Sequence, residues 1–260
     1  QIFFWQSPKK IGLEVTGKRS LILKLERNST RNSKRLHRRS TSMLNEYISN
    51  SSAQIKRKIK DFHVLGDRIY VQIRDPLPEE INFTDIFDRV RDFLPDAFFL
   101  GLESIIIGQH KDFVEKHYNA FYQDGTLYIT NDQDNEADLI DDIVHEIAHL
   151  IEERYGDSLL RAEFLGKRKK LLDILIYAGY NVPRDEFLEL EYSKRLDDFL
   201  YREVGYRTLS NTIHGLFLGP YSTTSIREYF ATGFEDYFLK YGERNYLKAL
   251  CPMLYGKFAA

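Results

Sequence analysis

Cysteine is almost missing from this 260-residue chain, which has a single thiol at Cys251. One cysteine cannot form an intrachain disulfide, and it cannot build a cysteine-based zinc cage. Long apolar runs are missing too, because no stretch approaches the roughly 20 residues that cross a bilayer as a helix. The sequence therefore excludes a disulfide-stapled domain and predicts no membrane span.

The N-terminal residues, QIFFWQ, lack a basic segment followed by a sustained apolar one. We therefore expect no signal peptide at this position and a soluble protein. The remaining composition, 43% hydrophobic and 29% charged residues, is that of a globular protein. A chain of this length can form one large domain or two small ones. The compartment stays open, because a protein of this size needs no disulfides in any compartment.

Acidic residues are scarce near the N-terminus. Residues 1–60 contain 15 Lys or Arg and only 3 Asp or Glu, whereas the whole chain has 37 and 39. Residues 28–60 are rich in Ser, Asn, Arg and Lys, which is typical of an exposed arm. We expect a basic N-terminal extension over residues 1–60 and a folded domain over residues 61–260. Residues 27–60 are a candidate surface for an acidic partner or nucleic acid, with a solvated linker as the alternative.

Hydrophobic periodicity predicts both strands and helices in this chain. Strands are expected in a pair over residues 11–27, over 68–73 and 104–107, and in a hairpin of 118–122 with 126–130. Helices are expected over residues 83–93, 136–155, 158–178, 185–201, 225–241 and 245–254. This order predicts an α+β fold with a small mixed sheet and a helical C-terminal half.

The residues that indicate chemistry are His145-Glu146-Ile147-Ala148-His149, inside the predicted helix over 136–155. Histidines at positions i and i+4 share one helix face, where two neutral imidazoles can hold one Zn²⁺. Glu146 follows the first histidine and can take a proton from the attacking water. The motif therefore predicts a zincin metal site, with two ordinary surface histidines as the alternative. The second strand of the preceding hairpin is expected to lie over this site as a substrate-binding edge.

A third protein ligand has to come from elsewhere in the chain. The long metzincin motif needs Gly at 152 and His at 155, but the chain has Glu152 and Tyr155. A carboxylate from a later helix is the usual remaining solution. The candidates are Glu163, Glu186, Glu189, Glu191, Glu203, Glu228 and Glu235. Among them Glu163 lies in the basic stretch RAEFLGKRKK, so we expect it to pair with cations and not with a metal.

A second motif follows in residues 221–234, which read YSTTSIREYFATGF. With the HExxH helix, this motif resembles the anthrax lethal factor-like branch of the gluzincins. That branch has a later helix of the form Glu-aromatic-Phe-Ala, with a tyrosine seven residues before the glutamate. The resemblance covers roughly residues 117–240 and implies a zincin-like metalloprotease domain, with the small sheet over the HExxH helix.

The resemblance also implies a site. Zn²⁺ would be bound by His145, His149 and Glu228, and Tyr221 would support the oxyanion or the leaving amine. The chain departs from the family in the distance between the two motifs, because 78 residues lie between His149 and Glu228. We expect the inserted helices, over residues 158–201, to shape the substrate groove.

The function implied by the resemblance is a zinc-dependent endopeptidase acting on proteins or peptides, with Glu146 as the base. The alternative, from another class, is a non-catalytic component of a phage particle or toxin complex. Such a protein would keep the zincin scaffold and dock through the basic arm. The intact Glu146 favours the enzyme, because a scaffold need not keep it. Secreted toxin-like and virion-associated locations are both open.

Four further residues have weaker signals. Asp141 or Asp142 could accept the outer N–H of a ligand histidine. Interaction of these acidic residues with the helix dipole is the preferred interpretation. Glu235 lies two turns beyond Glu228. Two interpretations are equally favoured for it: a residue that supports the site, and a residue on a solvated face. His214 is expected to be an ordinary loop residue.

Overall fold

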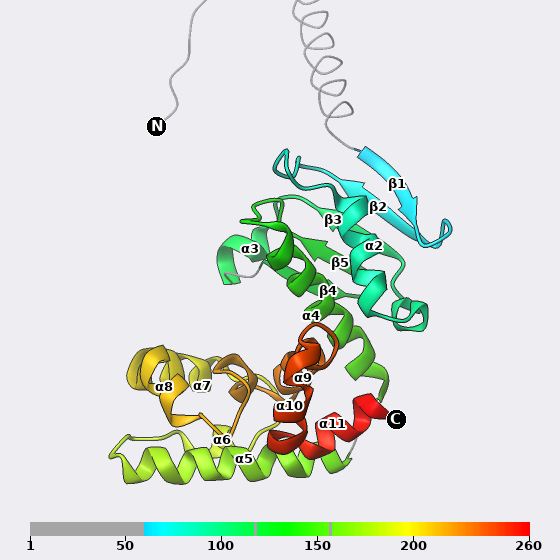
Figure 1. Ribbon diagram of the computed structural model, residues 1–260. Helices are drawn as coiled ribbons and strands as arrows, with labels where there is room; N and C mark the ends of the chain where they lie inside the picture. Colours follow the sequence, from blue (N-terminus) through cyan, green and yellow to red (C-terminus); the bar gives the residue numbers. More distant parts are fainter. Residues whose placement is uncertain (1–59, 117–118, 156–157) are drawn as a thin grey trace, which may run out of the picture. The chain divides into compact units, whose positions relative to one another are not determined.

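The computed structural model describes residues 60–116, 119–155 and 158–260 (Figure 1). The strand pair predicted over 11–27 and the basic arm up to residue 59 therefore lie outside the described residues. Lys60, which we assigned to the arm, is the first residue of strand β1.

The sheet of the described part has the strand order β1-β2-β3-β5-β4. Its strands are β1 (Lys60–Val64), β2 (Ile69–Ile73), β3 (Ser104–Ile107), β4 (Ala120–Gln123) and β5 (Thr126–Ile129). The β2–β3 and β3–β5 pairs are parallel, and the outer pairs are antiparallel. Val71, Ile105 and Leu127 lie in register across three strands, and all three are fully buried. This row of apolar side chains faces the core.

The hairpin of β4 and β5 turns at Asp124 and Gly125, whose φ angles are 48° and 79°. Two successive residues with positive φ make the turn type that matches the twist of a hairpin, and Asp-Gly favours it. The predicted hairpin is confirmed. The expectation that its second strand forms the edge is wrong, because β5 lies between β3 and β4. The edge strand on this side of the sheet is β4.

Two long helices pack with the sheet. In α2 (Phe83–Phe93) the Asn82 side chain accepts a hydrogen bond from the Thr84 amide and caps the first turn. The second, α4 (Glu136–Tyr155), contacts α2, β4 and β5. Its apolar stripe, which is fully buried in the core, consists of Leu139, Ile143, Val144 and Ile147. The short helix α3 (Lys111–Lys116) precedes β4.

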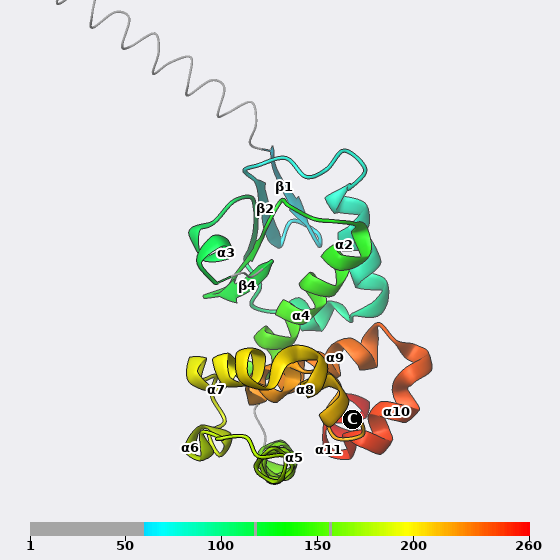
Figure 2. The ribbon, with the colours of Figure 1, turned by 90° about the vertical axis from the view of Figure 1, so that its left-hand side faces the viewer.

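The C-terminal half is helical, as predicted. Its elements are α5 (Ser158–Tyr177), α6 (Arg184–Phe187), α7 (Lys194–Asp198), the π-helix η2 (Phe199–Gly205), α8 (Tyr206–Thr212), the 3₁₀ turn η3 (Tyr221–Thr223), α9 (Ile226–Phe238), α10 (Arg244–Leu250) and α11 (Pro252–Ala259). In both ribbon views α4 lies between the sheet and α9, and α5 lies beyond α9 (Figures 1 and 2). The fold is thus α+β with a small mixed sheet. None of the helices in the described residues is long and apolar enough to span a membrane.

The helix predicted over residues 185–201 is not one helix. It is divided into α6 and α7 by residues 188–193. Arg168, on α5, donates hydrogen bonds to the backbone carbonyls of Glu186 and Phe187 at the end of α6. Ser193 then starts α7, where its side chain accepts from the Leu196 amide at 3.4 Å.

Candidate metal centre

The two histidines of α4 lie one turn apart on the face that is turned toward α9. Their ring centroids are 4.8 Å apart, and both rings are largely buried. One ligand atom each from His145, Glu146 and His149 can be chosen within 4.8 Å of one another. The helical repeat predicted from the sequence therefore brings these three side chains together, as a group that could hold a metal ion.

Helix α9 brings the carboxylate of Glu228 to the same place. Ser225 caps this helix by accepting from the Glu228 amide, and α9 packs along α4. One carboxylate oxygen of Glu228 lies 3.0 Å from Nε2 of His145, and the other lies 3.5 Å from Nε2 of His149. Ligands at about 2.0–2.1 Å from a tetrahedral zinc are about 3.3–3.5 Å from each other. The separations at this site are near this range, and each is measured to a different oxygen of Glu228.

Glu235 lies behind His145, with its Oε1 atom 2.5 Å from Nδ1 of the ring. Burial by itself would lower the pKa of His145, but hydrogen bonds to Glu228 and Glu235 raise this pKa well above its usual value. Of the two interpretations of Glu235, the structure favours the one in which it supports His145. Asp142 instead accepts from the Gln133 amide group at 3.3 Å.

His149 has a different environment. Burial, followed by the positive charges of His145 and Arg227, lowers its pKa well below the usual value, so the ring is neutral. In the part of the chain that the structure describes, its Nδ1 atom has no hydrogen-bond partner. A neutral imidazole is the form that binds metals. The two histidines thus differ in their outer contacts, although both turn Nε2 toward Glu228.

Glu146 is 8% exposed and is held by the edge strand. Its Oε2 atom accepts a hydrogen bond from the backbone N–H of Tyr122 at 2.8 Å. Burial raises the pKa of Glu146 to about 7. The edge strand and the motif helix therefore orient this carboxylate together.

Tyr221, on the 3₁₀ turn η3, lies beside His145. The centroids of the two rings are 6.3 Å apart, and the tyrosine is 45% exposed. The backbone N–H of Thr224 donates to the carbonyl of Tyr221 at 3.0 Å and closes this turn. All five residues that we assigned to the site from the sequence, His145, Glu146, His149, Tyr221 and Glu228, thus lie close together.

Two cavities meet at these residues. The smaller has a volume of about 270 Å³ and is also lined by Phe121, Ser225 and Arg227. The larger has a volume of about 880 Å³ and extends to α7 and the π-helix. His145, Glu146 and Tyr221 line both cavities. These three side chains therefore lie where the two cavities meet.

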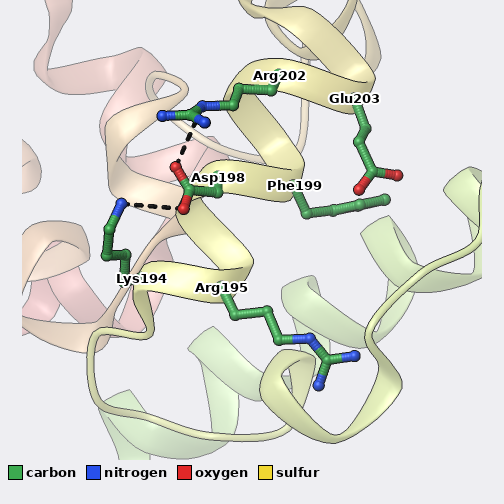
Figure 3. A pocket seen from close by; sticks show the side chains of 6 residues that line it. All are labelled: Lys194, Arg195, Asp198, Phe199, Arg202 and Glu203. Carbon is green, nitrogen blue, oxygen red and sulfur yellow. Dashed lines mark hydrogen bonds and ion pairs between the residues drawn. The ribbon is translucent and has the colours of Figure 1, made fainter.

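Helix α7 and the π-helix give the larger cavity a charged wall. Lys194 and Arg202 lie on opposite sides of Asp198, at 2.9 and 3.3 Å (Figure 3). All three residues line the larger cavity, together with Tyr201. Part of the inserted segment thus borders the groove.

The other carboxylates are engaged elsewhere or lie at the rim. The two oxygens of Glu163 accept from the Tyr229 hydroxyl at 2.6 Å and from the Met253 amide at 2.8 Å. The expectation that Glu163 pairs with cations is therefore wrong. Glu186 pairs with Arg195 at 2.9 Å, and Glu191 lines the smaller cavity. His214 is exposed and lines neither cavity.

Several residues of the site were not identified from the sequence. Tyr122, Tyr192 and Arg227 line the smaller cavity. Arg227 precedes Glu228 in the second motif, so its position in the sequence could have indicated that it lies near the site. Tyr192 lies within the helix predicted over residues 185–201, and that prediction gave no sign of a cavity wall.

Comparisons of the chain with protein-family models, with curated proteins and with solved structures found no match. The resemblance to the lethal factor-like gluzincins therefore rests on the two sequence motifs.

Proposed function

We propose that this chain is a zinc-dependent endopeptidase of the gluzincin type. One observation carries the proposal: the carboxylate of Glu228 lies 3.0 and 3.5 Å from the Nε2 atoms of His145 and His149. Glu228 lies dozens of positions after the two histidines in the sequence and comes from a different helix. Their convergence at metal-ligand spacing, beside a buried glutamate, is the arrangement that a hydrolytic zinc site needs.

The charges of the site also support a bound cation. Glu146, Glu228 and Glu235 surround the two histidines, and buried carboxylates need a positive partner. The donor set of two imidazoles and one carboxylate, with room for a fourth ligand, suits Zn²⁺. Zinc bound at such a site supplies Lewis acidity that activates water and polarises a peptide carbonyl.

Glu146 is the general base in this proposal. The hydrogen bond from the Tyr122 amide engages its Oε2 atom and fixes the plane of the carboxylate. The Oε1 atom is then the one that accepts the proton of the attacking water. Glu146 next donates this proton to the amine of the leaving group.

Tyr221 is the second catalytic residue that we propose. Its ring lies beside that of His145, and both side chains line the same cavities. A phenol in this position can donate a hydrogen bond to the oxyanion of the tetrahedral intermediate. Such a donor acts where negative charge develops during the reaction.

The groove supports an extended peptide as substrate. The edge strand β4 can pair with a substrate chain through backbone hydrogen bonds. The cavities of about 270 and 880 Å³ provide space on both sides of Glu146. Space on both sides favours cleavage within a chain over removal of a terminal residue.

Digestion of a peptide library, read by mass spectrometry, tests this function. The protein loaded with Zn²⁺ should cleave internal bonds, and a chelator should stop the cleavage. The control is Glu146→Gln, which keeps the size of the side chain but cannot accept the proton. Peptides that stay intact with the zinc-loaded parent, or cleavage by Glu146→Gln at the parent rate, would overturn the proposal.

A further inference from the structure

Arg168, on α5, has a fully buried guanidinium group with 0% exposure. A guanidinium has five N–H donors in a fixed plane. Each of these donors has an acceptor here, and every acceptor is a backbone carbonyl. The carbonyls belong to Glu186, Phe187, Glu189, Thr223 and Thr224.

The five carbonyls come from two segments that are distant in sequence. Nε donates to Phe187 at 3.2 Å, and Nη2 donates to Glu186 at 2.7 Å and Glu189 at 3.3 Å. Nη1 donates to Thr224 at 3.2 Å and also to Thr223. One side chain thus ties the end of α6 to the 3₁₀ turn η3.

The contacts are specific to arginine. The rings of Phe164 and Phe187 lie 5.2 and 5.3 Å from the guanidinium carbon and enclose it. The carboxylate of Glu186 pairs with Arg195, so it does not neutralise Arg168. A buried charge is costly unless its donors are satisfied, and a lysine has only three donors in another geometry.

The two segments held by Arg168 continue directly into the catalytic cavity. The Ile226 amide donates to the Leu190 carbonyl at 2.9 Å and joins them again next to the site. Half of the residues that line the smaller cavity come from these segments, namely Glu191, Tyr192, Tyr221, Ser225, Arg227 and Glu228. The other half comes from β4 and α4. Arg168 itself lines neither cavity.

We propose that Arg168 is a positioning residue that fixes this wall of the cavity, and above all the turn that carries Tyr221. This inference rests on the proposed function, since Tyr221 needs an exact place only if the site hydrolyses peptides. Release of the Thr223 and Thr224 carbonyls would free the turn, whereas His145 and His149 stay on α4 and Glu228 stays on α9, which packs along α4. Loss of Arg168 therefore acts on Tyr221 more than on zinc binding.

Steady-state kinetics of the full chain test this role with Arg168→Met, Tyr221→Phe and the double variant. Lys169→Met, an exposed position on the same helix, is the control. Arg168→Met should lower kcat by about 10–100-fold, the scale of a misplaced group, with KM changed less than about threefold. The double variant should be no slower than the slower single variant, because both changes remove one function. A parental kcat, or losses that multiply in the double variant, would overturn the inference.

Amide hydrogen exchange separates this inference from the proposed function. Arg168→Met should speed exchange at residues 223–228 relative to Lys169→Met, whether or not the protein cleaves peptides. An inactive parent would contradict the proposed function alone. Unchanged exchange at these amides would contradict the role of Arg168, whether or not the parent is active. If Arg168→Met does not fold, exchange at the same amides is measured for Arg168→Lys and tests the role in the same way.

Discussion

The role that we propose for Tyr221 depends on a single hydroxyl group. The ring lies beside His145, and the Thr224 N–H closes the backbone turn that carries it. Replacement by phenylalanine keeps the ring and removes only the oxygen.

For Tyr221→Phe we expect normal folding and normal zinc content. The variant should lose about 10²–10³-fold in kcat, the usual effect of one oxyanion donor. Steady-state kinetics with a peptide from the library that the parent cleaves measure this kcat. A kcat equal to that of the parent would remove Tyr221 from the catalytic residues.

Helix α9 serves both the site and the packing of the C-terminal half. Glu228 and Glu235 point to His145, while Gly233 meets α11 on another side. A Cβ atom on Gly233 would clash with Cδ2 of Leu254 on α11. The absence of a side chain at Gly233 therefore lets α9 and α11 approach closely.

Gly233→Ala should therefore destabilise the protein by about 1–3 kcal/mol through overpacking. The matched control is Gly166→Ala on α5, where an added Cβ meets nothing within 4 Å. That change should stabilise by about 0.5–1 kcal/mol, because alanine is the better helix former. Urea unfolding of both variants measures the difference. Equal stability of the two variants would show that α9 and α11 are not as close as described.

Local patterns predicted some elements to the residue. Helix α2 covers Phe83–Phe93 and β3 covers Ser104–Ile107, as the periodicity indicated. The break between α6 and α7 could not be predicted from local patterns, because the end of α6 contacts Arg168, which lies about 20 residues earlier in the chain. Strand β1 was missed because Lys60–Val64 alternates only weakly, and pairing with β2 stabilises it.

The candidate site also has residues that local patterns predict and residues that depend on distant contacts. His145, Glu146 and His149 follow from the helical repeat alone, because their spacing is local. Glu228 needed the second motif, since many later carboxylates were equally available to local reasoning. The contact of Glu235 with His145 spans 90 positions and is set by the packing of α9 on α4.

The ligands that we propose connect the two halves of the described part of the molecule. His145 and His149 lie on the helix that packs on the sheet, and Glu228 lies on a helix of the C-terminal half. A ligand that binds only the folded state stabilises the whole fold by mass action.

Zinc should therefore raise the melting temperature, and a chelator should reverse the rise. At a free zinc concentration of 100 times Kd the gain is about 2.7 kcal/mol. Scanning calorimetry with and without zinc measures it, with Mg²⁺ as the control, since Mg²⁺ prefers oxygen ligands. Equal melting temperatures with zinc and with chelator would argue against a folded-state zinc site.

The central claim is that α4 and α9 together close one zinc site, with Glu228 as the third protein ligand. Zinc titration of Glu228→Ala and Glu163→Ala tests this claim most directly. The two glutamates are alternatives from the sequence, but Glu163 is held by Tyr229 and Met253 away from the histidines. We predict that Glu228→Ala loses at least about 10–100-fold in zinc affinity, whereas Glu163→Ala keeps the parental affinity. Loss of zinc from Glu163→Ala, with zinc retained by Glu228→Ala, would contradict the account.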